Sequence, residues 1–214
     1  MGNDNFHRKR KERNTRRIRE EKKSVLISLE DTKSSKYYFE ELLKDKGLKG
    51  KITFADHIGT NPAKVLEALK KYKDKNTHEK FEKEWIVFDK DSYRKDEIDS
   101  VVTSAKQKGV CIAFSNESYE LWIILHFEKL ERWTTREELN KKLKKIFKDK
   151  YGKEYKKSSK DIYKMIIGMQ GNAITNAKNL YNMHDKNGKL SNYGVCNPMT
   201  TMYKLVEYLN ALRK

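Results

Sequence analysis

Short apolar segments alternate with helical patterns through the first 127 residues of the chain. Four segments rich in β-branched residues are each followed by a stretch whose apolar side chains recur at helical spacing; they are VLISL (25–29), KITFAD (51–56), EWIVFD (84–89) and VCIAF (110–114). Strands separated by helices of about 10–15 residues are typical of a mainly parallel sheet flanked by helices. Beyond residue 128 only helical patterns follow. The sequence therefore predicts an α/β core and an all-helical C-terminal part.

The same changes of pattern indicate how the chain is organised. We expect residues 1–23 to form a basic N-terminal arm, residues 24–127 the α/β core, and residues 128–214 a helical region packed on that core. Between residues 8 and 23 only Ile18 is clearly apolar, so the arm cannot bury a face by itself. No internal repeat or proline-rich linker marks a sharper boundary.

The charge of the chain limits its partners. Its 214 residues carry a formal net charge of +17. Nucleic acid is the commonest polyanionic partner of such a chain, and simple solubility is the alternative explanation. The N-terminal arm is its most basic segment, and a solvated tail is the alternative to a binding arm. The candidate phosphate contacts in the arm are Arg8, Lys9, Arg10, Lys11, Arg13, Arg16 and Arg17.

Membrane association is not expected. No run of about 18 apolar residues is present, and the N-terminal residues lack the apolar stretch of a signal peptide. No basic amphipathic helix with a strong apolar face is visible either. We therefore expect a cytoplasmic protein with no membrane partner.

Acidic side chains directly follow two of the predicted strands. Glu30 comes after VLISL, and Asp89 and Asp91 come after EWIVF. Ligands of open parallel sheets bind at the carboxyl ends of the strands, and residues two apart in an extended segment project to the same side. If the two strands are neighbours, the three carboxylates repel one another unless a cation compensates. Mg²⁺ or Mn²⁺ is the natural cation, and a solvated turn after each strand is the alternative.

The apolar run ESYELWIILHF (117–127) contains two further candidates. Glu120 has apolar neighbours in nearly every helical direction, and a buried carboxylate needs a cation or hydrogen-bond donors. We therefore expect Glu120 to face the other three carboxylates, brought there by the turn at Ser115 and Asn116. His126 is either a proton-transfer residue or a hydrogen-bonded structural histidine.

The order of these motifs resembles the RloB family of Toprim-like proteins, which are encoded near bacterial restriction and phage-defence genes. The resemblance covers roughly residues 8–212 and is carried by VLISLEDTKSSKYYFEEL (25–42), GTNP (59–62), VFDKD (87–91), SNESYELWIILHF (115–127) and NPMT (197–200). This chain departs from the family pattern at three places. Asp31 replaces a glycine, Ser34-Ser35 replaces a Thr-Glu pair, and Glu117 replaces a proline.

The resemblance implies a Toprim-like fold and roles for individual residues. Glu30 matches the family's acidic residue after the first strand, which acts as general acid or base and as metal ligand. Asp89 and Asp91 match its metal-binding pair. The later motif supplies Glu120 and His126 as catalytic candidates. Ser115 and Asn116 are expected to contact and position the site residues without binding the metal ion themselves.

These observations predict an Mg²⁺- or Mn²⁺-dependent endonuclease that cleaves phosphodiester bonds in DNA or RNA. The resemblance adds a role in bacterial phage defence together with a separately encoded ATPase, because the chain has no Walker motif. A non-catalytic scaffold that docks nucleic acid or an ATPase is the alternative, motivated by the departures at Asp31, Ser35 and Glu117. The kind of nucleic acid, its strandedness, the activating trigger and the formation of a homo-oligomer are left open.

Overall fold

A sheet of mainly parallel strands forms the centre of the computed structural model, which describes residues 24–48 and 50–212. Within these residues the sheet has five strands in the order β2-β1-β3-β4-β5. Four of them run parallel: β1 (Val25–Leu29), β2 (Ile52–Phe54), β3 (Lys83–Asp89) and β4 (Cys111–Asn116). The edge strand β5 (Met199–Thr200) pairs antiparallel with β4.

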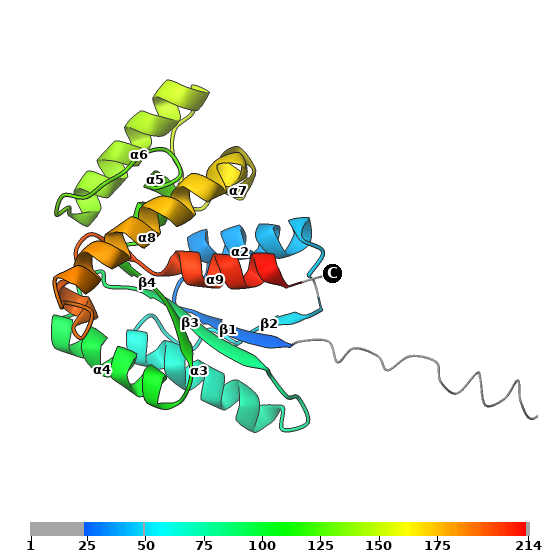
Figure 1. Cartoon of the computed structure of the whole chain (residues 1–214). Helices are drawn as coiled ribbons and strands as arrows, with labels where there is room; N and C mark the ends of the chain where they lie inside the picture. The colour runs from blue at the N-terminus through cyan, green and yellow to red at the C-terminus, as the bar shows by residue number, and fades with distance from the viewer. Residues whose placement is uncertain (1–23, 49, 213–214) are drawn as a thin grey trace, which may run out of the picture.

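Helices cover both faces of the sheet (Figure 1). One face carries α3 (Pro62–Lys75) and α4 (Lys95–Gln107), and the other carries α2 (Ser34–Asp45) and α9 (Met202–Ala211). The remaining helical segments stack beyond α2 and α9 or join the elements; they are α5 (Glu120–Ile124), α6 (Arg136–Tyr151), α7 (Ile162–Ile166), η1 (Ile167–Met169), α8 (Gln170–Lys186) and η2 (Tyr193–Val195).

Most residues of β1, β3 and β4 are buried because both faces of the sheet are covered. Successive side chains of a strand point to opposite faces of the sheet. In β1, Val25, Ile27 and Leu29 accordingly belong to the larger apolar core, whereas Leu26 belongs to the smaller core under α3 and α4. This arrangement confirms the predicted α/β class.

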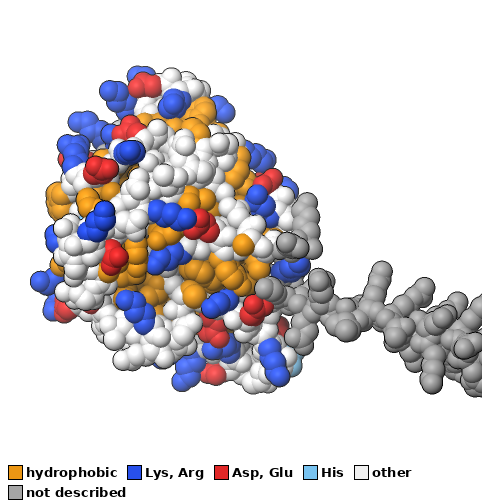
Figure 2. Space-filling view, viewed as in Figure 1, with side chains coloured by type: hydrophobic (Ala, Val, Ile, Leu, Met, Phe, Trp, Pro, Cys, Tyr) orange, Lys and Arg blue, Asp and Glu red, His pale blue; other side chains and the backbone are white. Residues whose placement is uncertain are grey.

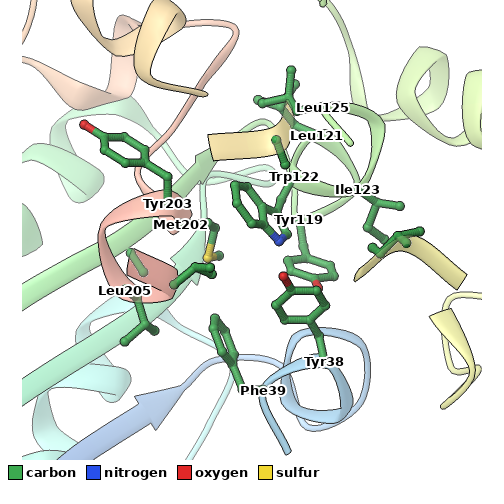
Figure 3. Packing of buried hydrophobic residues seen from close by; sticks show 14 of the residues in the cluster. Tyr38, Phe39, Tyr119, Leu121, Trp122, Ile123, Leu125, Met202, Tyr203 and Leu205 are labelled. Atoms are coloured by element: carbon green, nitrogen blue, oxygen red, sulfur yellow. The ribbon is translucent and has the colours of Figure 1, made fainter. Parts of the chain in front are cut away.

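The C-terminal helices share the larger core with the sheet. Figure 3 shows Tyr119 and Trp122 gathered with Tyr38 of α2 and with Met202 of α9. The ring centroids of Tyr38 and Trp122 lie 6.3 Å apart in an edge-to-face arrangement. Buried residues of α6 and α8 continue the same cluster. The helical region therefore packs on the core.

Two details differ from the sequence expectations. The C-terminal part is helical except for β5, which has only two residues and too little sequence to show a strand pattern. The apolar run 117–127 contains only one short helix, α5, because the chain is still leaving β4 at Asn116. The expected burial of this run is confirmed, since every residue from Ser118 to His126 is buried.

The surface is charged but mixed. Figure 2 shows Lys and Arg side chains interspersed with Asp and Glu over the visible face. The excess of positive charge is therefore not gathered into a single patch on that face. In the described part of the chain, no helix combines the length and the apolar character needed to cross a membrane.

Thr201 joins α9 to the sheet through its side chain. Its hydroxyl accepts a hydrogen bond from Phe114 N (2.9 Å) and donates one to Ile112 O (3.0 Å), in a fully buried position. The hydroxyl thus pairs backbone groups of β4 at a place where β5 has already ended.

We expect Thr201→Val to lower the free energy of unfolding by about 2–4 kcal/mol, because it leaves two buried backbone groups without partners. Denaturant unfolding measures this change. The matched control is Thr175→Val, which removes an exposed hydroxyl that donates within α8. Equal effects of the two substitutions would contradict a structural role for the Thr201 hydroxyl.

Candidate functional site

A cavity of about 200 Å³ opens where the carboxyl ends of β1 and β3 meet. Its charged lining consists of Glu30, Asp31, Asp89, Asp91 and Lys157. The three carboxylates expected from the strand ends therefore lie in one place, as the sequence predicts. Their chemical roles remain predictions.

Strand register brings Glu30 and Asp89 together. β1 and β3 are parallel neighbours, with Leu29 opposite Val87. The pairing continues one step beyond the strand, because Glu30 N donates to Val87 O at 2.9 Å. Asp89 N then donates to Glu30 Oε2 at 3.0 Å. The end of one strand thus fixes the carboxylate that follows the other.

The two carboxylate oxygens of Asp89 have different surroundings. Its Oδ2 accepts a hydrogen bond from Tyr119 N at 3.0 Å. Its Oδ1 is shielded from solvent and has no hydrogen-bond partner among the described residues. Burial raises the pKa of Asp89 well above its usual range, and the carboxylates of Asp91, Glu120 and Glu30 raise it further.

Asp91 reaches the same cavity by a different route from the one expected. β3 ends at Asp89, and Asp91 lies in a turn with a left-handed backbone (φ 44°), so the rule for extended chains does not apply to it. Its N–H donates to Glu117 O at 2.9 Å, and its Oδ1 lies 2.9 Å from Arg136 Nη1 at the start of α6. Burial raises the pKa of Asp91, and the positive charges of Arg136 and Lys157 oppose this rise.

Glu120 does not line the cavity, but it lies close enough to Asp89 and Asp91 to repel their charges. It begins α5, has no exposed surface, and raises the pKa of both Asp89 and Asp91 by repulsion. Its Oε1 lies 3.4 Å from Lys157 Nζ, although neither oxygen has a partner in hydrogen-bond geometry among the described residues. Burial and the charge of Glu120 raise the pKa of the Tyr155 hydroxyl.

Lys157 is a cation that the sequence reasoning missed. It lies in the loop between α6 and α7, and its side chain is 40% exposed. Burial lowers its pKa, but the carboxylates of Glu120, Asp89 and Asp31 outweigh burial and raise it. No local signal distinguishes this residue in a chain with 48 Lys and Arg. Only the folded chain brings it to the cavity.

Glu30 and Asp31 are adjacent in sequence and differ in ionisation. Burial is the main cause that raises the pKa of Glu30 to about 7, against the opposing hydrogen bond from Asp89 N. Asp31 is also desolvated, but its oxygens accept hydrogen bonds from Lys33 N (2.8 Å) and Ser35 N (3.0 Å), which lower its pKa overall. Asp31 thus anchors the start of α2.

The other candidates of the later motif have mainly structural contacts. Ser115 Oγ lies 3.0 Å from Thr200 Oγ1, and Asn116 Oδ1 accepts from Asn197 Nδ2 at 3.3 Å. Both therefore tie β4 to the C-terminal segment. His126 is fully buried, its Nδ1 lies 2.9 Å from Trp122 O, and burial lowers its pKa to about 4. The structure does not bring these three side chains into the lining of the cavity.

The basic arm cannot be placed from the structure. The candidate contacts from Arg8 to Arg17 all lie outside the described residues. Their role in binding nucleic acid stays a prediction.

The cavity suits a divalent cation in its chemistry but not in its present geometry. The shielded Asp89 Oδ1 lacks a donor, and oxygen ligands are those that Mg²⁺ and Mn²⁺ prefer. Within residues 24–48 and 50–212, however, no three His, Cys, Asp or Glu side chains stand close enough together to hold a metal ion. Two of the carboxylates, Glu120 and Asp91, instead pair with Lys157 and Arg136. The donor set fits the ion, and its side chains would have to move to bind it.

Fold and site together define an α/β protein with a cluster of carboxylates at the carboxyl edge of its parallel strands. A family model described as RloB-like protein matches residues 25–209, so the chain belongs to the RloB-like family. This confirms the resemblance seen in the sequence. No curated protein and no solved structure matches the chain.

The shifted carboxylates make stability depend on pH. Glu30 has its pKa raised from 4.5 to about 7, so between these values the metal-free folded protein binds more protons than the unfolded chain. The contribution of Glu30 to the free energy of unfolding should therefore fall as the pH rises through this window, by up to about 3 kcal/mol for a shift of this size, while the lowered pKa of buried His126 contributes in the opposite direction. Denaturant unfolding at a series of pH values in EDTA measures the slope.

The variant Glu30→Gln lacks this contribution, so its stability should increase relative to that of the parent as the pH rises from 4.5 to 7. Glu40→Gln, which changes an exposed carboxylate of α2, is the matched control and should keep the parent's slope. A stability difference between the parent and Glu30→Gln that stays constant from pH 4.5 to 7 would show that Glu30 does not have the raised pKa.

The pair between Lys157 and Glu120 can be tested by a double-mutant cycle. Lys157→Gln leaves the buried Glu120 carboxylate without its ammonium, so we expect a loss of about 1–3 kcal/mol in metal-free buffer, moderated by the exposure of Lys157. Adding Glu120→Gln should recover part of the loss. Lys156→Gln changes the exposed lysine next to it and should have little effect. Strictly additive effects of the two substitutions would exclude the pair.

Proposed function

We propose that this protein is a divalent-metal-dependent nuclease that hydrolyses phosphodiester bonds in nucleic acid. The observation that supports this best is the shielded Asp89 carboxylate, which faces three other carboxylates and has one oxygen without a donor. An acidic cavity repels a phosphodiester unless a metal ion lies between them. A divalent cation therefore reconciles this cavity with a chain whose net charge of +17 favours a polyanionic partner.

Glu30, Asp89 and Asp91 are the residues that would hold the ion. When bound, it would polarise a phosphoryl oxygen and offset the negative charge that develops during hydrolysis. Each of these carboxylates already lines the cavity. Glu30 and Asp89 lie at the ends of neighbouring parallel strands, and Asp91 lies in the turn that follows β3.

The chain itself supplies groups for proton transfer and for phosphate binding. Glu30 lines the cavity and could take a proton from an attacking water or give one to the leaving oxygen. Lys157 and Arg136, which now pair with Glu120 and Asp91, would be released toward phosphate oxygens when the ion neutralises these carboxylates.

The wider role that we propose follows from the RloB family. The chain resembles the RloB family of Toprim-like proteins, which are encoded near restriction and phage-defence genes. This resemblance supports a function in defence, with a separate ATPase as partner. The N-terminal arm would add phosphate contacts that do not read sequence.

A non-catalytic scaffold is the second candidate, and one observation favours it. Lys157 and Arg136 partly neutralise the cavity, and no three described side chains are arranged to hold a metal ion. In a scaffold these ion pairs would persist, and the cavity would serve only to hold the strand ends and α5 together.

Cleavage of mixed substrates separates the two candidates. We expect the full chain to cut at least one of single- and double-stranded DNA and RNA with Mg²⁺ or Mn²⁺, and not in EDTA. Glu30→Gln should lower the rate by about 10²- to 10⁴-fold, the usual effect of a general acid or base. Asp91→Asn should raise the Mn²⁺ concentration needed, and Glu120→Gln should abolish cleavage.

Melting curves show whether each variant is folded, and Asp96→Asn is the matched control, because Asp96 pairs with Arg94 on the surface. Binding of nucleic acid without cleavage under any of these conditions would leave the scaffold as the function.

A further inference from the structure

Two large apolar side chains are exposed in the described part of the chain. Trp133 exposes 64% of its surface and Val195 exposes 45%. Single exposed apolar residues are common, but a tryptophan exposed to this extent loses much of the stabilisation that burial of its ring would give. Its position relative to the cavity therefore matters.

Trp133 lies on a segment that hydrogen bonds to Asn197 hold in place. Its neighbour Thr134 is buried, and Thr134 N donates to Asn197 Oδ1 at 3.0 Å while Asn197 Nδ2 donates back to Thr134 O at 2.9 Å. Asn197 also donates to Asn116 at the end of β4. Val195 lies two residues before Asn197, so both exposed side chains belong to segments that Asn197 joins.

The chain itself limits the distance from Trp133 to the carboxylates. Arg136 follows three residues later and lies 2.9 Å from Asp91. Three residues span at most about 11 Å between Cα atoms, and the Arg136 side chain with its contact adds about 10 Å, so the limit is about 20 Å, the length of about six stacked nucleotides. A strand with a phosphate in the cavity therefore has bases within reach of the indole ring.

We propose that Trp133 is a stacking platform for an unpaired base, and that the substrate class is nucleic acid with a single-stranded segment at the site. This inference rests on the proposed function. An exposed indole offers a flat face on which any base stacks, whereas the bases of an intact duplex are already paired and stacked.

Charges of both signs flank Trp133. Arg132 and Arg136 are exposed and can contact phosphates, Arg136 once it leaves Asp91. Of the acidic neighbours, Glu138 is engaged in the cap of α6, where it accepts from Thr135 N at 2.8 Å, while Glu131 and Glu137 are exposed. The indole ring, and not the local charge, therefore carries the proposed recognition.

Tryptophan fluorescence reports this contact directly. The chain has three tryptophans, and the other two, Trp85 and Trp122, are 5% and 0% exposed. Titrating the full-length protein with a single-stranded oligonucleotide, in Ca²⁺ as an oxygen-liganded cation that takes the place of Mg²⁺ or Mn²⁺, should quench the exposed component of the emission. A blunt duplex of the same length should quench it much less. The affinity is measured separately, by anisotropy of a labelled oligonucleotide.

Variants separate stacking from a merely apolar surface. Trp133→Ala should weaken binding of the single strand by about 5- to 150-fold, the range for loss of one stacked base. Trp133→Phe should keep most of the affinity and lose the quenching signal. Val195→Ala, the matched change at the other exposed side chain, should leave the quenching intact.

Three results would overturn the proposal: unchanged emission on saturation, no binding of the oligonucleotide, or equal affinities of the parent and Trp133→Ala. Equal quenching by the blunt duplex would overturn the single-stranded substrate class. If cleavage is observed but Trp133→Ala binds normally, the nuclease function stands and the stacking platform fails. If quenching occurs without any cleavage, the platform stands and the nuclease function fails. Unchanged emission with every oligonucleotide would point to a protein partner for this surface.

Discussion

The structure depends on how the Asp89 carboxylate is kept in a shielded place beside three other carboxylates. Asp91, Glu120 and Glu30 all repel it, and burial adds to the cost of its charge. Two cations oppose this repulsion from the outside, Lys157 on Glu120 and Arg136 on Asp91, but one oxygen of Asp89 still has no donor. A fold without a use for this cluster would be more stable with apolar side chains in the same places. The energetic cost of keeping these carboxylates together is the physical argument for a functional site.

The rest of the fold is arranged around this cluster. Parallel pairing of β1 with β3 fixes Glu30 against Asp89, and the exit from β4 sets Tyr119 and Glu120 beside them. The apolar side chains of α5 are packed in the larger core. The helical C-terminal region is part of the site as well as of the core, because α6 supplies Arg136 and the loop after it supplies Lys157.

Much of this could be predicted from sequence, and the failures have physical causes. The apolar runs predict the four parallel strands, and the acidic residues after two of them predict the meeting of Glu30 with Asp89. Glu120 was found because a carboxylate in an apolar run needs a cation. Lys157 and Trp133 could not be found, because their importance lies in long-range contacts that leave no local pattern. β5 was missed because two residues cannot show a strand period, and Asp91 arrives through a left-handed turn rather than an extended strand.

Calorimetric titration of the metal-free protein with Mn²⁺ tests the central claim most directly, because it reports binding without requiring a substrate. Full-length parent protein should show saturable binding, and Asp89→Asn should weaken it by at least about tenfold, since it removes a carboxylate that the other three repel in the metal-free protein. Asp96→Asn, on the surface, should bind as the parent does. An absence of binding heat in the parent, or equal affinities of the parent and Asp89→Asn, would contradict a metal site at the carboxyl edge of this sheet.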